Sequence, residues 1–151
     1  MEYKIVEKAT FTVIGKARKF QGETSYEEIP KFWNEHMKSK DAENLCGMYG
    51  ICLDGDGKSF EYLIADNYIP WKEIPDGFVT KVIPAGTWAI FPCRGALPEA
   101  LQNVNTKIWK EWLPNCKEYK LAGNYNIEMY TPLCEKPEDN YSEIWVPVEK
   151  I

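Results

Sequence analysis

Hydrophobic residues recur along the chain with two different spacings, and these spacings predict where strands and helices lie. Alternating hydrophobic residues predict strands, whereas hydrophobic residues three and four positions apart predict helices. A threonine followed three residues later by a glutamate, as in Thr24 and Glu27, is typical of a helix start. The elements predicted in the first half are a strand over 10–20, a helix over 25–37 and a hairpin with strands over 48–53 and 60–65.

The second half repeats this order of strand, helix and hairpin. An extended segment over 78–91 leads to a helix that begins near Pro98, and Pro114 is expected to end this helix after Leu113. The closing hairpin is predicted from strands over 127–130 and 143–148.

The repeated order predicts an α+β fold of two pseudo-symmetric modules, each with an antiparallel sheet covered on one face by its helix. The 151 residues then form a single domain, with module one over 1–66, a linker over 67–77 and module two over 78–151. The uncovered sheet faces must be buried, and the other module is the simplest partner. We therefore expect a central cleft between the modules, which is a common place for a ligand site.

A Glu–aliphatic–aromatic pattern occurs in both strands of the closing hairpin. Alternate residues of a strand share a face, so Glu128 lies with Tyr130, and Glu143 lies with Trp145. The aliphatic residues between them are predicted to face the helix, which sends both carboxylates and both aromatic rings to the cleft. A carboxylate among aromatic rings suits a flat or cationic organic molecule.

Further residues join this candidate site through the repeat. Tyr49 and Glu61 occupy comparable positions in the first half. Trp88 and Phe91 lie on the segment that borders the cleft, and their faces stay open because Gly86 can introduce a bulge.

Composition narrows the classes of partner. Aromatic residues make up 14% of the chain, which is compatible with an aromatic pocket. The net charge is −5 and no dense Lys/Arg patch occurs, so direct nucleic acid binding is not expected. No apolar run approaches the roughly 18 residues of a membrane span. The five cysteines are scattered, which favours reduced thiols and a cytoplasmic location.

The residues of common catalytic and cofactor sites are missing from the sequence. His36 is the only histidine, so neither a Ser–His–Asp centre nor a zinc site is predicted. Residues 54–57 resemble the start of a calcium loop, but Ala65 stands where the closing Glu belongs, so a hairpin turn is predicted instead. We expect neither a metal nor a cofactor.

An ordered set of short stretches resembles the GyrI-like family, also called the AraC-type effector-binding domain. The stretches span nearly the whole chain and are Phe11–Gly15, Ile29–Trp33, Ile83–Phe91, Trp109–Pro114, Ile127–Tyr130 and Glu143–Val148. The resemblance implies two pseudo-symmetric modules with a central aromatic pocket, in which a buried Glu receives lipophilic, cationic ligands. Glu128 is the position that best matches this Glu, and Glu143 is the alternative.

The resemblance is compatible with more than one function. The first is a stand-alone binding protein for lipophilic, often cationic small molecules, used in drug sensing or sequestration. The second is a hydrolase of reactive electrophiles such as cyclopropane-bearing natural products, with Glu128 as general acid or base. A gyrase-inhibitor type of protein is a third. No helix-turn-helix precedes Thr10, so control of transcription by this chain alone is not expected, and any protein partner stays open.

Overall fold

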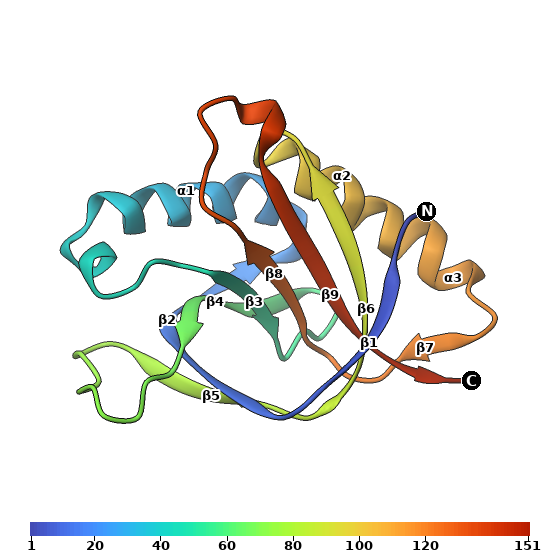
Figure 1. The fold of residues 1–151 in the computed structure, drawn as a ribbon, viewed down its shortest axis with the longest axis horizontal. Coiled ribbons are helices and arrows are strands. Elements are labelled where there is room, and N and C mark those ends of the chain that lie inside the picture. The colour runs from blue at the N-terminus through green and yellow to red at the C-terminus, as the bar shows by residue number, and fades with distance from the viewer. The chain divides into compact units, whose positions relative to one another are not determined.

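The computed structural model describes residues 1–151, and Figure 1 labels its helices and strands. The chain forms two compact units. Unit 1 consists of residues 1–9 and 85–151, and unit 2 consists of residues 10–84. Each unit combines an antiparallel sheet with helices, so the predicted α+β class is confirmed. No helix combines the length and the apolar character that crossing a membrane requires.

Unit 2 holds four of the labelled strands and one long helix. Its strands lie in the order β3–β4–β2–β5, and each neighbouring pair is antiparallel. Their bounds are β2 Phe11–Gln21, β3 Tyr49–Leu53, β4 Ser59–Asn67 and β5 Val79–Ile83, with helix α1 over Ser25–Lys38. Short 3₁₀ turns over Gly22–Thr24 and Lys40–Glu43 flank the helix.

Helix α1 packs on its sheet through one aromatic cluster. Phe32 meets Phe20 and Tyr62, and buried Leu45 completes the contact. The predicted capping box does not form, because the 3₁₀ turn already precedes the helix and Thr24 makes no capping hydrogen bond. His36 is buried in this unit with its ring Nε2 at 2.7 Å from the carbonyl oxygen of Leu45, so it has a packing role.

Unit 1 is built from the other strands and a longer helical segment. The strand order is β1–β6–β9–β8, with β7 pairing with β9, and all pairs are antiparallel. The strand bounds are β1 Lys4–Lys8, β6 Gly86–Arg94, β7 Tyr119–Leu121, β8 Asn126–Tyr130 and β9 Tyr141–Lys150. The helical segment comprises α2 Glu99–Lys107, a π turn over Ile108–Trp112 and α3 Leu113–Asn115.

The two units share one order of connections. In each, a long strand (β2 or β6) leads to a helix and then to a hairpin (β3–β4 or β8–β9). The second hairpin strand pairs with the long strand, and an additional strand, β5 or β1, pairs with the other edge of the long strand. The predicted pseudo-symmetric repeat of strand, helix and hairpin is confirmed.

The boundaries differ from those expected. Strand β5 pairs with β2, so unit 2 continues to Pro84 and does not end before the predicted linker over 67–77. Strands β1 and β7 were not predicted, since both are short and mix polar with apolar residues. The helical segment continues past Pro114 to Asn115, because Pro114 lies in the first turn of α3, where a proline ring is tolerated.

The helix-facing side of unit 1 carries its hydrophobic core. Ile144, Val146 and Val148 of β9 form one buried row with Leu101 and Ile108 of the helical segment. This confirms the predicted face of β9. Full burial of each such aliphatic side chain contributes about 1.5–3 kcal/mol, so the core fixes which face β9 turns away from the helix.

Candidate functional site

The pairing of β8 with β9 separates the two carboxylates that the sequence pattern places together. Paired residues of an antiparallel sheet share a face, and Glu128 pairs with Ile144 whereas Met129 pairs with Glu143. Ile144 lies in the helix-facing core, so Glu128 lies on that side and Glu143 on the other. The prediction that both carboxylates line one face is therefore wrong.

The two carboxylates were expected on one face because the sequence of the short strand β8 does not show which of its faces points to the helix. Strand β8 carries hydrophobic residues on both faces, with Ile127 and Met129 on one and Tyr130 on the other. Its alternation therefore does not say which face is inward. A shift of one residue in the pairing exchanges the faces, and here the ten-residue connection from 131 to 140 sets the pairing.

Several predicted site residues belong to the helix-facing side. The Tyr130 hydroxyl donates a hydrogen bond to Glu128 Oε1 at 2.8 Å, and Tyr130 packs against the core of unit 1. Phe91 is fully buried in this core, and its ring centroid lies 4.9 Å from that of Trp112. Phe91 therefore has a packing role in the structure, and Glu128 has a partner within its own strand.

On the opposite face, Glu143 is held by its own strand. The Tyr141 hydroxyl donates to Glu143 Oε2 at 2.6 Å, and Trp145 Nε1 donates to Oε1 at 2.9 Å. The three residues alternate along β9, which brings them to one face. Glu143 is 8% exposed, and no lysine or arginine forms a salt bridge with it. The buried carboxylate is thus bonded to neutral donors alone.

Aromatic rings continue from this carboxylate across the sheet. Trp88 pairs with Pro147, which places it on the same face, and its ring centroid lies 6.3 Å from that of Trp145. The ring of Tyr125 packs edge to face against that of Trp88, with the two ring centroids 5.6 Å apart. Trp88 is 1% exposed and its indole Nε1 has no hydrogen-bond partner. We call Trp88, Tyr125, Tyr141, Glu143 and Trp145 the Glu143 cluster.

Two basic side chains of unit 1 lie over rings of the Glu143 cluster. Lys8 Nζ lies 4.2 Å from the ring centroid of Trp145. The Arg94 guanidinium carbon lies 5.8 Å from the ring centroid of Tyr141, and Arg94 also forms a salt bridge with Glu2 at 3.0 Å. The rings beside Glu143 therefore already attract cations within the protein.

Burial raises the pKa of two tyrosines and one cysteine of unit 1. Burial and the hydrogen bond to the Glu143 carboxylate raise the pKa of Tyr141 to about 12, so its hydroxyl remains a donor at neutral pH. Burial also raises the pKa of Tyr125. On the helix-facing side, burial raises the pKa of the Cys93 thiol to about 12, so this cysteine is not a thiolate nucleophile at neutral pH.

The candidate residues of unit 2 have partners of their own. Tyr49 is buried and its hydroxyl donates to Asn67 Oδ1 at 3.2 Å, and burial raises its pKa. Glu61 forms a salt bridge with Lys81 at 3.7 Å, which balances its charge. Both lie on the sheet face opposite α1, since Tyr49 pairs with Ala65 and Ala65 alternates with Glu61 along β4.

Of the predicted site residues, the structure brings Trp88, Glu143 and Trp145 together. Tyr141 was missed because the strand was predicted to begin at Glu143, although a strand that started two residues earlier would have placed it beside that carboxylate. Lys8 gives no local signal, because only the pairing of β1 with β6 carries it to the site.

The chain also matches a known protein family. The sequence pattern of the Cass2 family, described as integron-associated effector binding protein, matches residues 4–148. The chain belongs to the Cass2 family. The effector-binding class that the sequence motifs imply is therefore confirmed.

This Cass2 chain has a distant relative among transcriptional regulators. It is 23% identical to the transcriptional regulator BrlR of Pseudomonas aeruginosa over 156 residues, covering 98% of this chain and 56% of that protein. The chain thus spans little more than half the length of that relative.

Solved structures share the Cass2 chain's fold. The structure of SAV2435 bound to tetraphenylphosphonium is 20% identical, with a TM-score of 0.87 over 99% of this chain and 94% of that one. An integron cassette protein of Vibrio cholerae is 17% identical, with a TM-score of 0.76 over 97% and 95% of the two chains.

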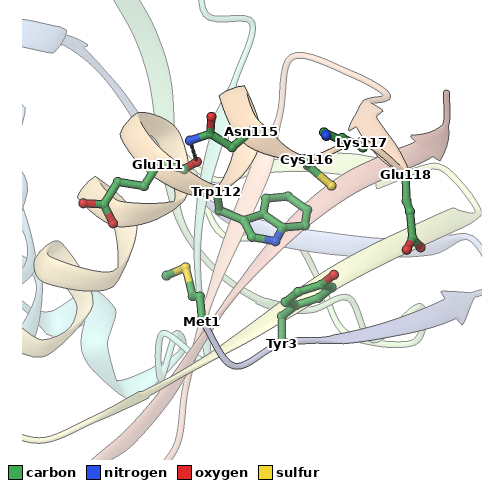
Figure 2. Close-up of a pocket in the computed structure, with 8 residues that line it drawn as sticks. All are labelled: Met1, Tyr3, Glu111, Trp112, Asn115, Cys116, Lys117 and Glu118. Carbon is green, nitrogen blue, oxygen red and sulfur yellow. Dashed lines mark hydrogen bonds between the residues drawn. The ribbon is translucent and has the colours of Figure 1, made fainter.

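The Cass2 chain also has a surface hollow on the other side of the unit 1 sheet. Its volume is about 490 Å³, and Figure 2 shows Tyr3 from the start of the chain and Trp112 from the helical segment lining it. The ring centroid of Tyr3 lies 5.0 Å from that of Trp112 and 5.5 Å from that of Phe91, which places this hollow at the helix-facing core. It contains no member of the Glu143 cluster. The remaining lining residues are Met1, Glu111, Asn115, Cys116, Lys117 and Glu118.

Proposed function

We propose that this Cass2 chain binds lipophilic organic cations at the Glu143 cluster, as a sensing or sequestering protein. One observation carries the proposal: a buried carboxylate accepts hydrogen bonds from Tyr141 and Trp145 and has no basic partner. A buried charge is costly unless an opposite charge balances it. A cationic ligand would supply that charge.

The surrounding rings favour a cation with an apolar body. A cation over an aromatic face gains about 0.5–2 kcal/mol, depending on how far it is removed from water. Apolar groups add about 25 cal/mol for each Å² that they bury, so a phenyl group burying roughly 100 Å² contributes about 2.5 kcal/mol. Because neither term depends strongly on shape, we expect a broad range of lipophilic cations to bind.

The comparisons support this choice of ligand class. The family is one of effector-binding proteins, and SAV2435, which shares the fold, holds tetraphenylphosphonium. In that ion the charge lies at the centre of four phenyl groups, which is the combination that a carboxylate beside aromatic rings suits. Tetraphenylphosphonium is therefore the probe we choose for this chain.

The test compares two buried glutamates of unit 1 that lie on opposite sheet faces. Tetraphenylphosphonium is titrated by calorimetry into the wild-type chain and into the Glu143→Gln and Glu128→Gln variants. Glu128 is the matched control, because it too is buried and bonded to a tyrosine hydroxyl. We expect Glu143→Gln to weaken binding at least tenfold, about 1.4 kcal/mol, and Glu128→Gln to leave it nearly unchanged.

A ligand of opposite charge completes this test. Tetraphenylborate has nearly the same shape as tetraphenylphosphonium and carries a negative charge, so it should bind the wild-type chain much more weakly. Equal affinity for the two ions, or a larger loss in Glu128→Gln than in Glu143→Gln, would contradict the proposal. Recovery of the phosphonium unchanged by mass spectrometry would accompany binding without turnover.

A further inference from the structure

Strand β1 delivers a lysine to the face that carries the Glu143 cluster. Val6 pairs with Trp88, so Val6 lies on that face, and Lys8 shares it because the two residues alternate along the strand. Lys8 pairs with Gly86, which adds no side chain beside it. The lysine side chain extends to Trp145, and its Nζ lies 4.2 Å from the ring centroid.

The Lys8 ammonium is held by fewer partners than the Arg94 guanidinium, the other cation over the Glu143 cluster. Arg94 over Tyr141 is also held by Glu2 through two hydrogen bonds at 3.0 and 3.4 Å. Lys8 forms none of the salt bridges of the structure, and its side chain is half-buried. The indole face is thus the partner of Lys8, and release of its ammonium breaks no ion pair.

Trp145 links this lysine to the carboxylate proposed to bind the ligand. Its indole Nε1 donates to Glu143 at 2.9 Å while its ring face receives the Lys8 ammonium. A cation that approaches Glu143 and stacks on the same face of Trp145 as Lys8 needs the position that Lys8 holds. Two positive charges on one ring face repel each other, so both cannot occupy it.

We propose that Lys8 is an internal competitor, which an incoming cation must displace from Trp145. This inference rests on the proposed function and adds a selection rule to it. A small hydrated ammonium gains nothing over Lys8, because one ammonium–indole contact replaces another. A bulky cation gains the burial of its apolar groups as well, so Lys8 restricts the site to lipophilic cations.

The charge of Lys8 can be removed with a matched control on the same strand. Lys8→Gln removes the competitor, while Lys4→Gln removes the same charge from an exposed residue of β1 that touches no ring of the cluster. We expect Lys8→Gln to bind tetraphenylphosphonium two- to thirtyfold more tightly than Lys4→Gln, the range that corresponds to one cation–π contact. Lys8→Arg should bind more weakly than the wild-type chain, because guanidinium stacks better on an indole.

A second readout follows the lysine itself. Stacking on the indole should shift the ε-methylene protons of Lys8 upfield in NMR spectra, and the signal assigned through Lys8→Gln should return to an ordinary lysine position as tetraphenylphosphonium saturates the chain. Methylammonium at the same concentration should leave the signal in place.

The outcomes separate this inference from the proposed function. Binding by the wild-type chain with equal affinities in Lys8→Gln and Lys4→Gln, or with an unmoved Lys8 signal, overturns the competitor and leaves the binding function standing. Binding only in Lys8→Gln supports the competitor and contradicts the proposed function of the wild-type chain. Absence of binding in the wild-type chain and in both glutamine variants overturns the proposed function together with the inference.

Discussion

The hydrogen bonds to Glu143 make a sharp prediction about two substitutions of nearly equal size. In Glu143→Leu, the Tyr141 hydroxyl and Trp145 Nε1 both lose their acceptor. A buried donor without an acceptor costs about 1–3 kcal/mol. Trp145 is buried and bears this cost, whereas the half-buried Tyr141 hydroxyl has access to water and adds less. Since domains are typically stable by about 5–15 kcal/mol, a loss of about 1–3 kcal/mol is a measurable part of the total.

Glu143→Gln should behave differently because of the chemistry of its neighbours. The tryptophan Nε1–H can only donate, whereas a tyrosine hydroxyl can donate or accept. A glutamine can therefore turn its carbonyl oxygen to Trp145 and its amide to Tyr141, which keeps both hydrogen bonds. The bonds lose their charge assistance, but burial of the neutral amide also costs less, so we expect a net change within about 1 kcal/mol.

Urea denaturation followed by circular dichroism measures the free energy of unfolding of both variants. A third protein, Glu143→Leu with Tyr141→Phe, removes the half-buried donor and should recover at most about 1 kcal/mol, the lower end of the cost of a buried donor. The prediction is refuted if Glu143→Gln destabilises the chain as much as Glu143→Leu does.

Two further predictions concern positions outside the carboxylate. Gly15→Ala should strongly destabilise unit 2, because a Cβ there would overlap the backbone carbonyl oxygen of Ile64; urea midpoints are compared with those of Gly22→Ala, where the added Cβ keeps an ordinary distance of 3.4 Å. The pKa of Tyr141 is raised from 10.0 to about 12, so its stabilising contribution is complete below about pH 10 and is lost as the pH rises towards 12. Tyrosinate absorbance should show one inflection near that value that Tyr141→Phe removes, and an unchanged titration would contradict the assignment.

The sequence predicted what depends on long, regular patterns. The order of strand, helix and hairpin in each half followed from periodicity, and the buried row of Ile144, Val146 and Val148 followed from the uniform alternation of β9. These features are robust because many residues contribute to each. The effector-binding class followed from short motifs in the order of the family.

The site depended on details that local patterns do not carry. Strand β8 has only five residues and hydrophobic side chains on both faces, so its pairing placed Glu128 and Tyr130 with the core and left Glu143 on the other side. Lys8 reaches Trp145 only through the pairing of β1 with β6, which joins segments far apart in the sequence. Strand pairing between segments distant in the sequence therefore determines which residues come together at the site.

The central claim is that an organic cation lies against the Glu143 cluster, and a crystal structure of the chain with tetraphenylphosphonium tests it most directly. We predict that the phosphonium lies on the sheet face that carries Glu143, with a phenyl group against Trp145 and with Lys8 moved from that ring. The account is contradicted if the ion lies beside Glu128 on the helix-facing side, or in the hollow between Tyr3 and Trp112, with Lys8 still over Trp145.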